Sequence, residues 1–210
     1  MAEIVDLSEI YSAEYHAIAG ERGEKQYPAK QDMARALDEM FRPKRVIDVG
    51  CGRGWWLEYW ALNRPEVEIV GLDGCAELIK RNNQCHESIR DKIHSCDLRQ
   101  PMWWRPWFEE PWDLVLCVEV AEHLPESYAR QLVGGLRVLG NRIFFSAARP
   151  GQKGVGHTFC RDKRYWIEQF AYFGFQPDMA LWRKWHDRLQ HRGKRYGRNI
   201  RRNAILFTRG

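Results

Sequence analysis

Two carboxylates and an imidazole lie close together in the segment LCVEVAEHL, residues 116–124. The segment begins as an apolar run typical of a buried strand and then places Glu119, Glu122 and His123 within five positions. If a helical turn begins at Glu119, these residues occupy positions i, i+3 and i+4 and share one face. Two carboxylate oxygens and one imidazole nitrogen form the start of a divalent cation site. His157, in GVGHTF, is the expected second histidine.

A parallel sheet is the element that would position these residues. Short β-branched runs alternate along the chain with segments of helical periodicity. The expected strands are residues 44–50, 67–73, 113–119, 141–147, 176–181 and 203–208, with a further strand ending at SCDL, 95–98. The expected helices are residues 6–19, 30–41, 54–63, 75–83, 125–139 and 162–173. This alternation predicts an α/β fold with a largely parallel sheet.

Ligands of an open parallel sheet bind beyond the carboxyl ends of its strands. The first strand is followed by DVGCGRG, whose glycines permit a ligand to approach the backbone closely. Asp73, after the second strand, is placed to accept ribose hydroxyls, and Asp97 could accept an exocyclic amine. Trp55 stands where a dinucleotide fingerprint needs glycine, and no G-K-[ST] is present. These strand ends suit an adenosine that carries a cation better than one that carries phosphates.

The series VIDVGCGRG, VGLD, CDL and DLVLCVEVAEHL resembles the motifs of class I S-adenosylmethionine (SAM) dependent methyltransferases over residues 44–148. FFSAARPGQKGVGH and YWIEQFAYFGF are similar to segments of bacterial members that act on small molecules or sugars. The resemblance implies a Rossmann-like, doubly wound, seven-stranded, mostly parallel sheet with one antiparallel strand near the C-terminus. It also implies SAM as cofactor. The cofactor-binding residues that it implies are Asp48, Gly50, Cys51, Gly52, Asp73, Gly74, Asp97, Leu98 and Glu119.

The spacing E-x-x-E-H, with a histidine downstream, is similar to that of two metal-dependent branches of this family. These are the O-methyltransferases of ubiquinone biosynthesis and the small-RNA 2′-O-methyltransferases. In many other members the E-H pair works without a metal, the glutamate capping a helix and the histidine facing the substrate as a base. Three interpretations therefore stay open: a divalent cation held by Glu119, Glu122, His123 and His157, a metal-free base, or a structural role.

Methyl transfer from a sulfonium requires an aligned nucleophile that loses its proton. A cation lowers the pKa of a hydroxyl, and a neutral histidine accepts its proton. We therefore expect His123, His157 and Glu122 to be catalytic in O-methylation of a small molecule or glycan. The alternatives are an RNA 2′-O-methyltransferase that uses a divalent metal, and a non-catalytic SAM-binding or nucleic-acid-binding protein. No [DNS]-P-P-[YF] and no Pro-Cys nucleophile follow the 113–119 run, which disfavours methylation of nucleobases.

The 210 residues suit a single domain, 1–210. Its expected parts are an N-terminal helical lid (1–43), a SAM-binding core (44–148) and a substrate-side C-terminal part (149–210). An acidic N-terminus, six cysteines without paired spacing and no apolar run of membrane length favour a cytoplasmic protein without a membrane span.

Aromatic and basic residues mark both ends of the chain. Tyr11, Tyr15, His16 and Tyr27 either cover the pocket or dock a helix, and Trp103 or Trp104 either stacks on adenine or packs a loop. Residues 183–202 carry nine lysines and arginines against one acid, within a net charge of +5. This segment suits RNA phosphates with base stacking, or the solvated face of a last helix. The oligomeric state stays open.

Overall fold

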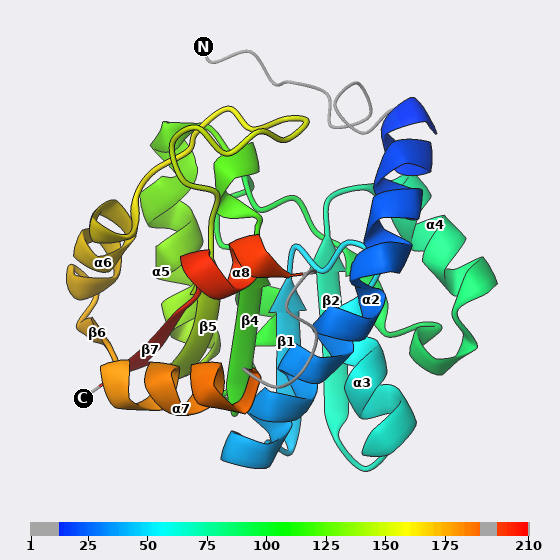
Figure 1. Ribbon diagram of the computed structural model, residues 1–210, viewed down its shortest axis with the longest axis horizontal. Coiled ribbons are helices and arrows are strands. Elements are labelled where there is room, and N and C mark those ends of the chain that lie inside the picture. Colours follow the sequence, from blue (N-terminus) through cyan, green and yellow to red (C-terminus); the bar gives the residue numbers. More distant parts are fainter. Residues whose placement is uncertain (1–12, 190–196, 210) are drawn as a thin grey trace.

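A single seven-stranded sheet forms the centre of the computed structural model, which describes residues 13–189 and 197–209 (Figure 1). The strands are β1 (Arg45–Val49), β2 (Glu68–Asp73), β3 (Ile93–Ser95), β4 (Leu114–Val118), β5 (Arg142–Ser146), β6 (Phe175–Pro177) and β7 (Ile205–Arg209). The α-helices are α2 (Ala13–Phe41), α3 (Trp55–Asn63), α4 (Ala76–Cys85), α5 (Ala129–Leu139), α6 (Lys163–Ala171), α7 (Met179–Leu189) and α8 (Arg198–Asn203). Short 3₁₀ turns are η1 (Glu87–Ile89), η2 (Arg105–Trp107), η3 (Ala121–His123) and η4 (Glu126–Tyr128).

The strand order is β3-β2-β1-β4-β5-β7-β6. β1 pairs in parallel with β2 and β4, and the β2–β3 and β4–β5 pairs are parallel too. β7 runs antiparallel to both β5 and β6. The expected Rossmann-like sheet with one antiparallel strand near the C-terminus is therefore confirmed. Its order reverses between β1 and β4, and at such a point the two crossovers leave opposite faces and open a crevice.

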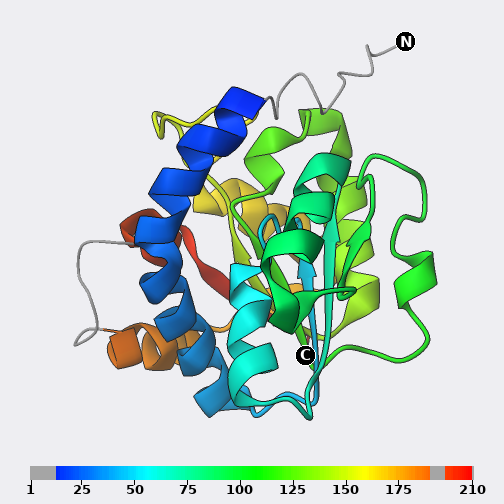
Figure 2. The same cartoon turned by 90° about the vertical axis from the view of Figure 1, so that its right-hand side faces the viewer.

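Helices cover both faces of the sheet, as the side view in Figure 2 shows. Successive side chains of a strand point to opposite faces. Ile47 therefore packs into a core with residues of α5 and α6, whereas its neighbour Val46 packs into a second core with residues of α2, α3 and α7. Strands that are buried on both faces read as continuous apolar runs, which is why β1, β4 and β5 were legible in the sequence.

Two expected elements near the chain ends differ from the structure. Instead of helices at 6–19 and 30–41, one helix, α2, runs through Pro28, and residues 6–12 lie outside the described part. Packing of α2 against α3 and α7 stabilises it beyond what local propensity alone predicts. The expected strand 176–181 is wrong after Pro177, where the chain turns into α7. Asp178 caps the N-terminus of this helix, since its Oδ1 accepts a hydrogen bond from the amide of Leu181 (2.9 Å).

Membrane insertion was not expected from the sequence. Within residues 13–189 and 197–209, no helix combines the length and apolar character that a bilayer span requires.

Candidate active site

In the glycine-rich turn after β1, Gly50 and Gly52 differ in what a side chain at each position would meet. Gly50 has a φ of 75°, and a Cβ at this position would overlap the Val120 side chain. Gly52 has a φ of 55°, but a Cβ there would meet nothing within 4 Å. Gly50 is thus required by the protein's own packing, whereas Gly52 faces open space that a ligand can approach. Cys51, between them, is buried.

Residues of β2 and α4 hold this turn in place. Asp73 Oδ2 accepts a hydrogen bond from the amide of Gly52 (2.8 Å), and its Oδ1 accepts one from the amide of Cys75 (2.9 Å). Gly74 lies between Asp73 and Cys75 in the chain. Asn82 Nδ2 donates to the Gly52 carbonyl (2.8 Å). Asp73, which the sequence predicts to accept ribose hydroxyls, therefore also fixes the shape of the turn. The role of the buried Asn82 was missed in the sequence, where it is one of two adjacent asparagines in a polar helix.

The segment after β3 lies beside Asp73 at the same sheet edge, because β2 and β3 pair with Asp73 opposite Ser95. Asp97 accepts hydrogen bonds from the guanidinium of Arg99 at 2.8 and 2.9 Å. Burial alone would raise the pKa of Asp97, but these bonds lower it. Leu98 is buried, and its carbonyl accepts Gln131 Nε2 (2.8 Å).

The aromatic residues of the loop after β3 serve packing in this structure. Trp103 is 4% exposed and lies against Gly135 of α5, where a Cβ would overlap its indole. The packing alternative therefore applies to Trp103. Trp104 is half-buried and meets Phe108 edge-on, with ring centroids 6.3 Å apart.

A lysine from α2 enters the site, which the sequence did not predict. Burial lowers the pKa of Lys30 to about 8, although Asp48 and Glu119 oppose this shift. Its Nζ lies 4.6 Å from the ring centroid of Trp55, at the start of α3. Asp48 is 1% exposed and its Oδ2 makes no hydrogen bond. Burial raises the pKa of Asp48 to about 7, with Lys30 acting in the opposite direction.

Of these N-terminal residues, only Tyr27 has a described side chain. Tyr11 lies outside the described residues, and Tyr15 and His16 are described only as backbone of α2. Tyr27 meets Trp55 edge-on, with centroids 6.3 Å apart. Burial and the nearby carboxylate of Glu58 raise the pKa of Tyr27 to about 12. Its contacts fit helix docking against the start of α3.

Glu119 does not begin the expected helical turn. Its φ is 57°, in the left-handed region, and the 3₁₀ turn η3 begins two residues later at Ala121. The Glu119 carboxylate accepts hydrogen bonds from Ser146 Oγ (2.9 Å), Gln152 Nε2 (2.8 Å) and Asn203 Nδ2 (3.1 Å). The expected convergence of Glu119 with Glu122 and His123 on one helical face is therefore wrong, because the turn at Glu119 directs its carboxylate toward β5 and α8.

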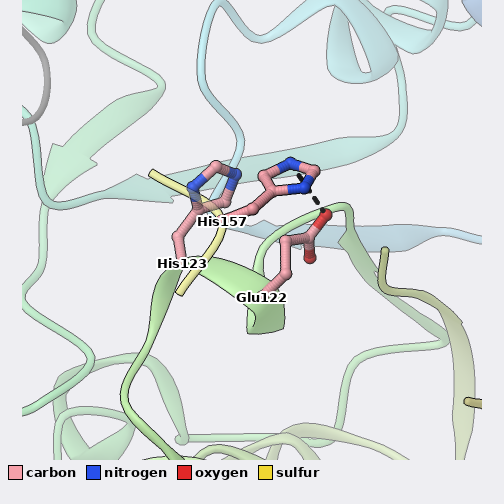
Figure 3. A group of neighbouring side chains, drawn as sticks. All are labelled: Glu122, His123 and His157. Carbon is pink, nitrogen blue, oxygen red and sulfur yellow. Dashed lines mark ion pairs between the residues drawn. The ribbon is translucent and has the colours of Figure 1, made fainter. Parts of the chain in front are cut away.

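Glu122, His123 and His157 do come together (Figure 3). One potential ligand atom of each lies within 4.8 Å of the others. Glu122 Oε1 is 3.9 Å from Nε2 of His157, and the two imidazole rings lie edge to face with centroids 5.1 Å apart. The Glu122 carbonyl accepts the amides of Thr158 and Phe159, both at 3.0 Å, and so ties the loop that carries His157 to η3.

The hydrogen bonds of the two histidines define their tautomers. His123 Nδ1 lies 3.1 Å from the carbonyl oxygen of Gly156, and His157 Nδ1 lies 3.0 Å from that of Gln152. A carbonyl oxygen only accepts, so Nδ1 of each ring carries hydrogen. In the neutral form, the lone pair is then on Nε2, the atom that a metal or an acidic proton would meet.

Electrostatics in this group favour a cation or an acid–base role. Glu122 is fully buried and neither carboxylate oxygen makes a hydrogen bond of regular geometry. Burial and the charge of Glu119 raise the pKa of Glu122 to about 8. Burial and His157 lower the pKa of His123 to about 4, so its imidazole is neutral at pH 7. Two imidazole nitrogens and one carboxylate fit a divalent cation, which would replace the proton on Glu122.

The basic C-terminal segment lies on α7 and α8, with residues 190–196 outside the described range. Arg183 and Lys184 are exposed. Trp185 is fully buried against Phe144, with ring centroids 4.8 Å apart, so it anchors α7 and cannot stack on a base. Trp182 is half-buried and stacks on His186.

The sequence matches the family described as a methyltransferase domain over residues 22–195. The chain therefore belongs to this family of methyltransferase domains. No curated protein matches the sequence.

Its architecture is that of solved SAM-dependent methyltransferases. One from Archaeoglobus fulgidus is 18% identical at a TM-score of 0.62, over 77% of this chain and 74% of the other. CalS10, an amino pentose methyltransferase from Micromonospora echinaspora, is 16% identical at 0.65, over 95% and 98%. The methyltransferase domain of bacterial CtHen1 is 16% identical at 0.58, over 87% and 98%.

Proposed function

We propose that this protein transfers a methyl group from SAM to a hydroxyl oxygen of a small-molecule or glycan acceptor. The observation that carries the proposal is the group formed by Glu122, His123 and His157, because both imidazoles direct the Nε2 lone pair by donating Nδ1–H to a carbonyl. O-methylation needs a group that takes a proton or stabilises an alkoxide at the acceptor. SAM, when bound, supplies an electrophilic methyl group.

The residues present fit SAM. Gly52 faces open space, and the orphaned Oδ2 of Asp48 is available to the donor's ammonium group. We assign the amino acid moiety to Asp48, Gly50, Cys51 and Gly52. The ribose is assigned to Asp73 and Gly74, and the adenine to Asp97 and Leu98. Glu119 stays a predicted cofactor contact.

Lys30 adds a positive charge that suits the carboxylate of SAM, since it lies close to Asp48 and Trp55. Replacement of Lys30 with Gln is expected to weaken SAM binding about tenfold, because a charge-assisted bond is lost. Isothermal titration calorimetry measures this, with Lys44→Gln at an exposed position as the control. Equal affinities of the two variants would contradict the assignment.

Gly50 and Gly52 provide a matched pair of substitutions. Gly50→Ala is expected to lower the free energy of unfolding by about 2 to 4 kcal/mol, since the new methyl group overlaps Val120 at a positive φ. Gly52→Ala is expected to cost only about 1 kcal/mol but to weaken SAM binding at least tenfold, because the methyl group enters open space. Denaturant titration measures the stability of both variants, and calorimetry measures their SAM affinity. Equal losses of stability and of affinity in the two variants would contradict the prediction.

A divalent cation would be held by Glu122, His123 and His157, whose donor set fits it. Such a cation lowers the pKa of a hydroxyl that it contacts. Glu119, also predicted as a ligand, would have to leave Ser146, Gln152 and Asn203 to join this group.

The decisive experiment is transfer of labelled methyl from SAM into fractionated cell extract, with and without a chelator. We expect label in a small-molecule or glycan fraction that survives nuclease treatment. Label that disappears with nuclease would replace this proposal by the second one. SAM binding without transfer to any pool would point to a non-catalytic protein.

The second candidate is an RNA 2′-O-methyltransferase that uses a divalent metal. It is favoured by the exposed basic residues of α7 and by the E-x-x-E-H spacing of Glu119, Glu122 and His123. Binding to RNA should then weaken steeply with added salt, as counterions are released. Absence of retention on heparin or RNA at low salt would remove this candidate.

A further inference from the structure

We propose that Gln152 and Asn203 are positioning residues that, through Glu119, hold His157 in place; the proposal rests on the proposed function, in which His157 lies at the reacting centre. Neither residue was predicted as a site residue from the sequence, although Gln152 lies in the segment FFSAARPGQKGVGH. Their importance comes from one hydrogen-bond network that joins β4, β5, the loop after β5 and α8.

The network begins at a strained residue. Glu119 is a non-glycine residue with a φ of 57°, a conformation that side chains with a Cβ disfavour. Its amide donates to the Ser146 carbonyl (2.9 Å), and its carboxylate accepts three side-chain hydrogen bonds. Bonds to an ionised carboxylate are stronger than neutral ones, so they offset the strain and anchor whatever donates them.

Gln152 connects this anchor to the histidine. Its Nε2 donates to Glu119 Oε2 (2.8 Å), and its Oε1 accepts Asn203 Nδ2 (2.9 Å). The backbone carbonyl of the same residue accepts Nδ1–H of His157 (3.0 Å). Both polar atoms of the Gln152 side-chain amide are thus bonded, and the backbone carbonyl of the same residue accepts the bond that selects the tautomer and direction of the His157 ring.

Asn203 brings the C-terminal helix into the site. It is the last residue of α8, is 2% exposed, and its Nδ2 donates to both Glu119 Oε1 (3.1 Å) and Gln152 Oε1. The loop after β5 is thereby held between β4 and α8.

The imidazole ring of His157 is packed closely against its own loop. A Cβ at Gly154 would overlap the His157 ring, so the ring rests directly against the backbone of its own loop. The bond from His157 Nδ1 to the Gln152 carbonyl therefore couples the position of the ring to that of Gln152.

Exchange of the carboxylate of Glu119 with the amide of Gln152 tests the network. Gln152→Glu places two acceptors face to face, and Glu119→Gln places two donors face to face, so each single variant loses at least one bond. The double variant, Glu119→Gln with Gln152→Glu, permits every bond again with the amide and carboxylate exchanged. Gln176→Glu, exposed on β6, is the matched control for the added charge.

The readout is the nitrogen NMR spectrum of the His157 ring in the full-length protein, assigned by its loss in His157→Ala. We expect both single variants to change the ring nitrogen signals from those of the Nδ1–H tautomer, and the double variant and the control to keep the native signals. Native signals in Gln152→Glu, or failure of the exchange to restore them, would overturn the proposal.

The ring signals require no acceptor and no bound cation. They therefore decide the positioning role even if the extract assay finds no methyl transfer, which would refute the proposed function alone. In active enzyme, Gln152→Glu should lower kcat about tenfold while the SAM dissociation constant stays within about twofold.

Discussion

Methyl transfer by His123→Ala and by His157→Ala is expected to fall by about 10²- to 10⁴-fold, the range that a positioned acid–base group contributes. Both rings converge with Glu122, and each holds its lone pair on Nε2 by donating from Nδ1. SAM binding should stay within about twofold, because neither histidine is among the residues assigned to the cofactor. The measurement is kcat on the acceptor found in the extract assay, beside calorimetry with SAM.

The control for these variants is His186→Ala, since His186 lies on α7 and stacks on Trp182 outside the group. It should retain turnover within about twofold. Near-native turnover of both His123→Ala and His157→Ala would show that neither residue is catalytic, and the oxygen-methylating assignment would lose its support.

Glu122→Gln is expected to stabilise the protein at pH 8 to 9, in the absence of divalent cations, by on the order of 3 kcal/mol. The pKa of Glu122 rises from 4.5 to about 8 on folding. Between these values the folded state keeps a proton that the unfolded state releases, so wild-type stability is complete below pH 4.5 and falls as pH rises toward 8. The amide variant carries no such proton and should lack this slope.

Denaturant unfolding of both proteins from pH 4 to pH 9, with a chelator present, measures the difference. The two stabilities should converge near pH 4. Added Mn²⁺ should then stabilise the wild type selectively, because a ligand that binds only the folded state shifts the equilibrium. Parallel curves across this range would mean that Glu122 is not held protonated by burial.

The meeting of the predicted cofactor residues at one sheet edge was legible in the sequence because its signals are local. Gly50 and Gly52 are needed for positive φ values within a turn directly after a strand, and Asp73 follows the next strand. Once the alternation predicts adjacent parallel strands, these residues must meet at one edge. Lys30 escaped prediction because no local pattern distinguishes a lysine that turns toward Asp48 from one on a solvated helix.

The grouping of the residues predicted to be catalytic was anticipated in part. Glu122 and His123 are neighbours in sequence, and the loop of His157 had to open at the same edge as β4. Glu119 was assigned to a helical turn by spacing alone. Its backbone instead takes the left-handed conformation, stabilised by Gln152 and Asn203, which lie 33 and 84 residues further along the chain.

By itself, the sequence determined the order of strands and helices from β1 to α6, the glycine turn and the acids at the strand ends, since side-chain periodicity and turn geometry are properties of short segments. The tertiary structure alone decided the burial of Glu122, the tautomers of the histidines and the direction of the Glu119 carboxylate. These depend on the dielectric surroundings and on hydrogen-bond partners that only the packing of distant segments provides.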